Sequence, residues 1–213
     1  MRTIVITGAS DGIGAAASRQ LVSKGHRVIL VGRSPEKTRA VAEELGMPHH
    51  LADFADLAQV RRLADELLAA YPRIDVLANN AGGIFGPRML TTDGFEQTFQ
   101  VNHLGPFLLT NLLHERLVDS GASVVQTASA AARLFSRFDI ADLNGARRYS
   151  GRVAYGNAKL ANILFTRELQ RRWGSEGVTA AAFHPGVVAT GFAGNLTGPF
   201  RWMYHNPLAK RLL

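Results

Sequence analysis

The 213-residue sequence contains no cysteine. This absence excludes disulfides, cysteine-ligated zinc, iron–sulfur clusters and a thiol nucleophile. A hydrophobic core must therefore hold the fold, which suits a reducing compartment, and we expect a cytoplasmic protein. Hydrophobic residues make up 46% of the chain and charged residues 19%, a balance typical of globular proteins. At this length we expect residues 1–213 to form a single domain.

Long hydrophobic runs are also missing from the sequence. None approaches the roughly 20 apolar residues of a membrane-spanning helix. The apolar run near the start, Ile4–Ile6, is shorter than the about 7 to 15 residues at the centre of a signal peptide. The sequence therefore predicts neither a membrane span nor a secretion signal.

Acidic residues are scarce beside basic ones. The sequence has 17 Asp and Glu residues and 24 Lys and Arg residues, which gives a net charge of +7. Nucleic-acid binding is one interpretation of such a balance. However, the basic residues are spread along the whole chain and form pairs rather than runs of five or more. This distribution favours a solvated surface or a small ligand that carries phosphate, and we expect no nucleic-acid partner.

Short runs of apolar residues alternate along the chain with longer helical patterns. The expected strands are Thr3–Thr7, Arg27–Val31, His49–Leu51, Ile74–Ala78, Ser123–Thr127 and Val178–Phe183. The expected helices are Gly12–Lys24, Pro35–Leu45, Leu57–Tyr71, Gly94–Asp119 and Arg152–Trp173. Alternation of nearly all-apolar strands with helices predicts an α/β fold with a doubly wound, Rossmann-like parallel sheet. Ligands of such sheets bind beyond the carboxyl ends of the strands.

A glycine-rich segment, TGASDGIG at Thr7–Gly14, follows the first strand and opens the first helix. Its G-x-x-x-G-x-G spacing differs from the usual G-x-G-x-x-G. It still provides a tight turn, close backbone approach and free amides for a pyrophosphate. A glycine-rich turn without a ligand is the alternative interpretation. The residues expected to contact a cofactor here are Gly8, Ser10, Asp11, Gly12, Ile13 and Gly14.

No acidic residue stands at the end of the second strand, where a protein that binds NAD usually holds the ribose. Gly32 and Arg33 occupy these positions, and an arginine fork suits a 2′-phosphate. The sequence thus favours NADP(H) over NAD(H), although a carboxylate at Asp11 works against it. After the third strand, Asp53 is placed to reach an adenine edge, with Phe54 beside it. A helix cap or a loop acid is the alternative for Asp53.

Tyr155 and Lys159 lie four residues apart and therefore on one face of the last long helix. A nearby ammonium would lower the pKa of a tyrosine, ordinarily near 10, and make it a general acid–base nearer neutral pH. The Y-x-x-x-K pattern alone is common by chance. Three other motifs accompany it after strands: NNAG at Asn79–Gly82, then Ser129, and HPGVVAT at His184–Thr190.

Together these motifs resemble the short-chain dehydrogenase/reductase family over nearly the whole chain. The segments Val101–Leu109 and Asp142–Leu169 are similar to its retinol-dehydrogenase-like branch, whose members use NADP. The resemblance implies an oxidoreductase that transfers a hydride between NADP(H) and a small-molecule carbonyl or alcohol. It is also compatible with a homo-oligomer.

The resemblance further implies a role for each matching residue. Tyr155 would exchange a proton with the substrate oxygen, Lys159 would lower its pKa and bind the nicotinamide ribose, and Ser129 would hold the substrate oxygen. Ser129 as a simple turn hydroxyl is the alternative. Asn102 would support a water relay for the proton, and the alternative is a polar side chain bonded to the backbone within its helix. The remaining expected cofactor contacts are Asn80, Ala81, Gly82, Pro185, Gly186, Val188 and Thr190. We expect no metal site.

The end of the sequence departs from the family pattern after the HPGVVAT motif. We expect residues 194–213 to form a lid or a tail and the strand Val178–Phe183 to lie at a sheet edge. Apolar residues in the segments that would wall the substrate pocket indicate a bulky hydrophobic substrate without identifying it. These residues are Phe85, Met89, Leu134, Phe135, Phe138 and Phe192.

Two other functions remain as alternatives. The first is a redox sensor that binds the cofactor with little turnover. The second is a sugar-nucleotide epimerase or dehydratase, which disagrees with the spacing of the glycine-rich segment and with the length of the chain.

Overall fold

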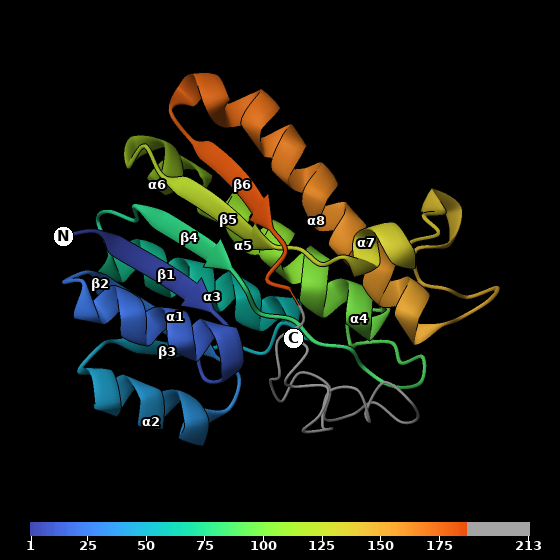
Figure 1. Cartoon of the computed structure of the whole chain (residues 1–213), viewed down its shortest axis with the longest axis horizontal. Coiled ribbons are helices and arrows are strands. Elements are labelled where there is room, and N and C mark those ends of the chain that lie inside the picture. The colour runs from blue at the N-terminus through green and yellow to red at the C-terminus, as the bar shows by residue number, and fades with distance from the viewer. Residues whose placement is uncertain (187–213) are drawn as a thin grey trace.

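The computed structural model describes residues 1–186 (Figure 1). Their strands form one sheet in the order β3-β2-β1-β4-β5-β6, and every neighbouring pair is parallel. The strands are β1 (Thr3–Thr7), β2 (Arg27–Gly32), β3 (His49–Leu51), β4 (Val76–Asn79), β5 (Ser123–Thr127) and β6 (Thr179–Phe183). The predicted doubly wound α/β sheet is confirmed, and the strand order reverses between β1 and β4.

Eight α-helices belong to the described residues. They are α1 (Gly12–Ser23), α2 (Pro35–Leu45), α3 (Leu57–Ala70), α4 (Gln97–Phe99), α5 (Gly105–Leu112), α6 (His114–Asp119), α7 (Ala131–Leu134) and α8 (Gly151–Trp173). A π-helical turn at Gln100–Leu104 and short 3₁₀ turns at Ile140–Asp142 and Gly174–Glu176 complete the elements. None of these helices is long and apolar enough to cross a membrane.

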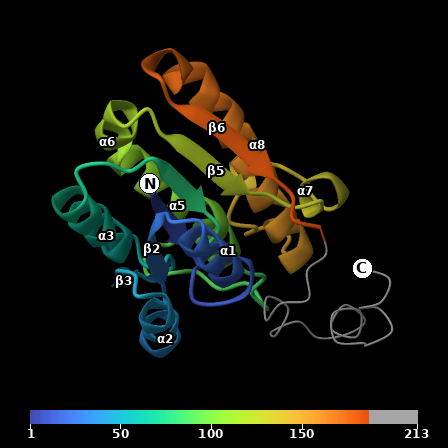
Figure 2. The same cartoon turned by 60° about the vertical axis from the view of Figure 1, so that its left-hand side comes forward.

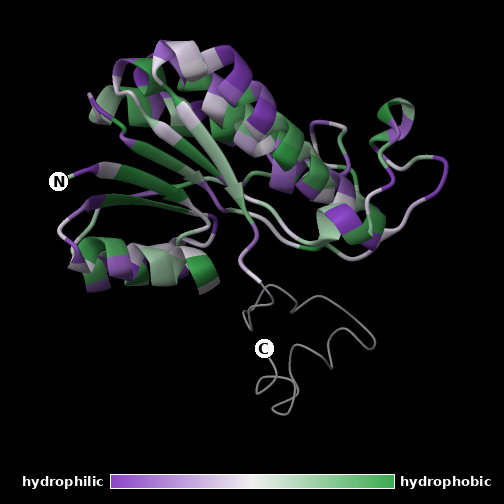
Figure 3. Ribbon diagram, turned by 45° about the horizontal axis from the view of Figure 1, so that its top comes forward, coloured by the Kyte–Doolittle hydropathy of each residue, from purple (hydrophilic) through white to green (hydrophobic). Residues whose placement is uncertain are grey.

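Helices cover both faces of the sheet (Figures 2 and 3), and the strands pack apolar side chains against the helices on both sides. Successive strand residues point to opposite faces. In β1, Val5 therefore packs with the core formed by α3, α5 and α8, whereas Ile4 and Ile6 pack with α1 and α2. All three side chains are at most 4% exposed. This arrangement brings the carboxyl ends of β1, β2, β4 and β5 to one edge.

The predicted continuous helix Gly94–Asp119 is wrong. The helix starts later, because Glu96 caps α4 by accepting two backbone N–H bonds of 2.9 and 2.8 Å. The π-helical turn then precedes Pro106, which has no N–H to donate to the carbonyl of Asn102, four residues earlier. A further break at Leu113, with φ −91° and ψ 5°, separates α5 from α6. The short α4 and the π turn place Asn102 beside the loop that follows β4.

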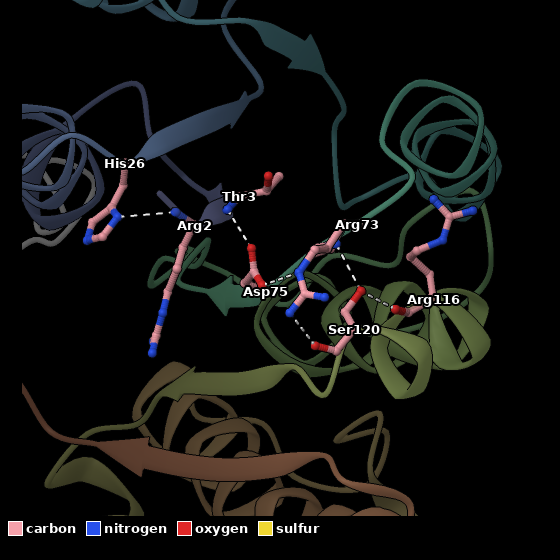
Figure 4. Close-up of polar contacts among 8 residues, drawn as sticks. Arg2, Thr3, His26, Arg73, Asp75, Arg116 and Ser120 are labelled. Carbon is pink, nitrogen blue, oxygen red and sulfur yellow. Dashed lines mark hydrogen bonds and ion pairs between the residues drawn. The ribbon is translucent and has the colours of Figure 1, made fainter.

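A polar cluster closes the amino ends of β1, β4 and β5 (Figure 4). Asp75 accepts hydrogen bonds from the Thr3 N–H at 2.7 Å and from Arg73 Nε at 2.6 Å. Arg73 also donates to the Ser120 carbonyl at 3.0 Å. These bonds satisfy backbone groups where the strands begin, and they lie at the edge of the sheet opposite to the glycine-rich segment. The cluster therefore aligns the strands.

Strand β6 forms one edge of the described sheet, and four of its five residues are exposed. Residues 194–213, predicted as a lid or tail, lie outside the described residues, as do the predicted site residues Val188 and Thr190 and the predicted wall residue Phe192.

Candidate active site

The carboxyl edge of the sheet borders a cavity of about 1360 Å³. This volume exceeds the roughly 300–1,000 Å³ of a typical small-molecule pocket. Most of the predicted site residues line it. From the predicted set, the lining residues are Gly8, Ser10, Asp11, Gly12, Ile13, Arg33, Asp53, Phe54, Asn80, Ala81, Gly82, Ser129, Tyr155, Lys159, Pro185 and Gly186.

The glycine-rich turn packs directly on the loop after β4. Gly8 has a φ of +67°, and a Cβ there would lie 2.9 Å from the Cα of Ala81. A Cβ on Gly14 would lie 2.2 Å from the Gly8 carbonyl oxygen, so neither position can carry a side chain without moving backbone. Gly14 packs behind the turn and is not among the residues that line the cavity. Its contribution is to the shape of the turn.

The hydroxyl of Thr7 and the side chain of Asn80 fasten this turn to the loop. Thr7 Oγ1 accepts from the N–H groups of Asn80 and Ala81 at 3.0 and 2.9 Å. Asn80 Nδ2 donates to the Thr7 carbonyl at 2.9 Å. The NNAG motif thus fixes the backbone of the glycine-rich segment, and the loop brings Ala81 and Gly82 to the cavity.

Two cations and one carboxylate meet near the end of β2. Asp11 caps α1 by accepting from the Gly12 N–H at 2.7 Å, and Lys37 Nζ lies 3.2 Å from its other oxygen. The Gly12 N–H and then Lys37 lower the pKa of Asp11. Arg33 and Lys37 both line the cavity. Sequence reasoning missed Lys37, although its position four residues after Arg33, in the first turn of a predicted helix, could have revealed it.

Glycine at position 32 is a packing requirement. A Cβ there would lie 2.2 Å from Thr38 Oγ1 and 3.1 Å from the Ser10 Cβ. An acidic side chain at position 32 would therefore have to displace the side chain of Thr38 and crowd that of Ser10. On β3's side of the cavity, Asp53 Oδ1 accepts from the Ala55 N–H at 2.9 Å, which is the loop role named as its alternative. Phe54 is 4% exposed and packs in the core.

Ser129, Tyr155 and Lys159 converge on the cavity from β5 and α8. Lys159 Nζ lies 5.5 Å from the centre of the Tyr155 ring and donates to the Thr127 carbonyl at 2.9 Å. Only 2% of Lys159 is exposed, and burial lowers its pKa from 10.5 to about 8. Ser129 Oγ accepts from the Ala131 N–H at 3.2 Å, so it serves as a turn hydroxyl and still borders the cavity.

Glycine 156 lets α7 approach α8 beside the tyrosine. A Cβ there would lie 2.8 Å from the Ser136 nitrogen and 2.9 Å from the Ala131 carbonyl oxygen. This close contact holds the segment after β5 against the start of α8, so the hydroxyls of Ser129 and Tyr155 reach one cavity. In the sequence, the small residue directly after Tyr155 is the one local indication of this close approach.

Asn102 does not line the cavity. Its Nδ2 donates to the carbonyls of Gly83 and Thr98, both at 2.8 Å, and its Oδ1 accepts from the Gly83 N–H at 3.1 Å. The side chain therefore bonds to the backbone, both within its own helical segment at Thr98 and outside it at Gly83, and it fastens the loop that carries Gly82. Its part in a proton relay remains a prediction.

The predicted substrate wall is brought together in part. Phe85, Leu134 and Phe135 line the cavity, whereas Met89 and Phe138 do not. Arg152 and His184 also line it. No group of three or more His, Asp or Glu residues within 1–186 could hold a metal ion.

The chain is similar to oxidoreductases of known name. It is 49% identical over 196 residues to a protein provisionally named daunorubicin C-13 ketoreductase DnrU, from Streptomyces sp. (strain C5), covering 89% of this chain and 67% of that protein. It is 43% identical over 194 residues to retinol dehydrogenase 12 of Mus musculus, covering 88% of this chain and 61% of that protein. The chain thus spans about two thirds of these curated relatives.

A solved structure and a family profile agree with these relatives. The Pseudomonas aeruginosa RhlG/NADP active-site complex superimposes with a TM-score of 0.77 and 26% identity, covering 98% of this chain and 78% of that one. The profile of the family described as short chain dehydrogenase matches residues 2–199. This chain therefore belongs to the short-chain dehydrogenase/reductase family of oxidoreductases, in its retinol-dehydrogenase-like branch.

Proposed function

We propose that the protein transfers a hydride between NADP(H) and the carbonyl or alcohol group of an apolar substrate, with Tyr155 as the general acid–base. The observation that carries this proposal is a single cavity lined by the glycine-rich turn at one end and by Ser129, Tyr155 and Lys159 at the other. No observation favours the alternative of a redox sensor with little turnover.

The groove fits a dinucleotide phosphate. The Gly12 N–H bonds to Asp11, and the amides that follow it in the first turn of α1, a helix of 12 residues, would receive a pyrophosphate. At the end of β2, position 32 is a glycine because a side chain there would meet Thr38. No acidic side chain at this position therefore repels a 2′-phosphate. Arg33 and Lys37 supply two cations there, and Lys37 offsets the charge of Asp11 at 3.2 Å. The proposed preference is therefore for NADP(H).

The proton and hydride take separate routes in the proposed reaction. NADPH, when bound, supplies the hydride that reduces the carbonyl carbon. The Tyr155 hydroxyl gives its proton to the carbonyl oxygen, and Ser129 donates a hydrogen bond to the same oxygen. The Lys159 ammonium stabilises the phenolate that Tyr155 leaves behind. Alcohol oxidation runs the same steps backwards.

The far end of the cavity favours apolar substrates. Phe85, Leu134 and Phe135 line it, with Arg152 beside them. The relatives include proteins named as a ketoreductase of daunorubicin and as retinol dehydrogenases. A bulky aldehyde or ketone is therefore the substrate class that we propose.

The test is a panel of aldehydes and ketones, including retinal and polycyclic aromatic ketones, with loss of NADPH absorbance as the readout. We expect turnover in the wild type and a kcat at least 10²-fold lower in Tyr155→Phe, because general acid–base catalysis contributes about 10²- to 10⁴-fold. Tyr71→Phe is the matched control, since Tyr71 is 4% exposed and bonds to His50 away from the cavity. Near-native kcat in Tyr155→Phe would refute the assignment.

A further inference from the structure

Asn162 is a buried amide outside the proposed catalytic set. It lies on α8 three residues after Lys159 and is 2% exposed. Its Nδ2 donates to the main-chain carbonyl of Asn102 at 3.0 Å. Its Oδ1 lies 2.9 Å from His103 Nδ1, which must then carry the proton. One side chain thus joins α8 to two consecutive residues of the π-helical turn.

The carbonyl of Asn102 lacks the donor that an α-helix would give it. In an α-helix it would accept from the residue four positions on, which is Pro106 and has no N–H. The backbone shifts to a π turn, in which the Gly105 N–H donates to the Gln100 carbonyl. A single turn of this kind often marks a functional site. Because the Asn102 carbonyl is buried, losing the Asn162 bond would leave it short of a partner.

The side chain of Asn102 connects the π-helical turn to the surroundings of Lys159. The side chain of Asn102 holds both backbone groups of Gly83. A Cβ on Gly82 would lie 2.4 Å from Asn102 Oδ1 and 3.4 Å from Lys159 Nζ. Asn162 thus bonds to Asn102, whose side chain fixes the loop of Gly82 and Gly83, and Gly82 lies near the ammonium of Lys159.

We propose that Asn162 is a positioning residue for the reaction: by bonding to the Asn102 carbonyl it holds the π turn in place, and through the Asn102 side chain it holds the loop of Gly82 and Gly83 beside Lys159 for resupply of the proton. This inference rests on the proposed function. Asn162 acts at the main-chain carbonyl of Asn102, and the Asn102 side chain passes this restraint to the backbone of Gly83. Asn162 itself touches neither substrate nor cofactor, since it does not line the cavity.

Two substitutions separate the donor from the acceptor. Asn162→Leu removes both bonds at similar volume. Asn162→Asp keeps an acceptor for His103 but loses the donor to the Asn102 carbonyl. Thr166→Val is the matched control: Thr166 lies one turn further on α8, is 8% exposed, and its hydroxyl donates to the Asn162 carbonyl at 2.8 Å. A role in folding alone would affect the control and the two variants alike.

We expect both Asn162 variants to lower kcat about 10- to 100-fold while KM for NADPH changes less than threefold. The solvent deuterium isotope effect on kcat should rise, because proton resupply becomes limiting. In the nucleotide-free protein, the Gly83 amide, which donates to Asn102, should exchange at least tenfold faster. Thr166→Val should have a kcat within twofold of the wild-type value. Its isotope effect and its Gly83 exchange rate should be unchanged, whatever its melting temperature.

Failure of this inference and failure of the proposed function are distinguishable. If Tyr155→Phe is inactive while Asn162→Leu keeps at least half of the wild-type kcat, the positioning role is refuted and the proposed function stands. An Asn162→Asp variant with wild-type kcat would likewise refute it. If the wild type turns over no carbonyl compound, the proposed function fails. Even then, an unchanged exchange rate of the Gly83 amide in Asn162→Leu would refute the claim that Asn162 holds Asn102 in place.

Discussion

Replacing Lys159 by methionine should stabilise the nucleotide-free protein while it abolishes catalysis. Burial lowers the pKa of Lys159 from 10.5 to about 8, a difference that corresponds to about 3 kcal/mol of cost for keeping the ammonium in the folded state. Methionine fills a similar volume without a charge. The variant also loses the hydrogen bond from Lys159 to the Thr127 carbonyl, and this loss cancels about 1 kcal/mol of the gain in stability. We expect a net gain of about 2 kcal/mol at pH 7.

The sign of the pH dependence follows from the direction of the shift. Below pH 8 the lysine is charged in both the folded and the unfolded chain, so the folded wild type bears the full cost. Between about pH 8 and 10.5 the folded state gives up the proton first, and the wild type gains stability relative to the variant. The advantage of Lys159→Met should therefore vanish as the pH approaches 10.5.

Urea denaturation from pH 6 to 10.5, without nucleotide, measures this difference. At pH 7 the gain corresponds to a melting temperature about 6 °C higher for a chain of this size. Lys24→Met is the control, since Lys24 is exposed at the end of α1 and its loss changes the net charge equally. A Lys159→Met variant less stable than wild type at pH 7, or a gap that persists to pH 10.5, would refute the reasoning.

Three further predictions concern the cofactor groove and the substrate wall. Arg33→Ala and Lys37→Ala should each lower the ratio of kcat/KM for NADPH over NADH by about 10- to 100-fold, as loss of a charge-assisted hydrogen bond implies; a wild type that prefers NADH would contradict the NADP assignment. Gly14→Ala should cost about 1–3 kcal/mol by overpacking and weaken NADPH binding in a fluorescence titration, because its Cβ would meet the Gly8 carbonyl at 2.2 Å; wild-type melting and affinity would show that the turn can yield. Tyr149→Phe should lower the free energy of unfolding by about 2 kcal/mol and raise the substrate KM with kcat unchanged, because the Tyr149 hydroxyl bonds the segment before α8 to the buried carboxylate of Glu96 at 3.0 Å. An unchanged KM would show that this segment does not contribute to substrate binding.

Local patterns determined the class of fold and most of the groove. The apolar strands and amphipathic helices follow from the periodicity of single segments, and motifs that come directly after strands must meet at one edge of a parallel sheet. Gly8, Asn80 and Ser129 reach one cavity for that reason, and the four-residue spacing of Tyr155 and Lys159 places both on one face of α8. The start of α2 was also readable, because Ser34 and Pro35 are local signals for a helix terminus.

Contacts between distant segments decided the rest, and no local pattern reports them. The helix after β4 breaks where a capping carboxylate and a proline override its apolar periodicity, and the resulting turn aims Asn102 at the backbone of Gly83. Lys37 faces Asp11 only because α2 and the glycine-rich turn lie side by side. Asn162 looks in the sequence like any polar residue of a helix. The sequence by itself determined which residues follow each strand, whereas packing across the sheet decided which side chains face the cavity and which ones hold them in place.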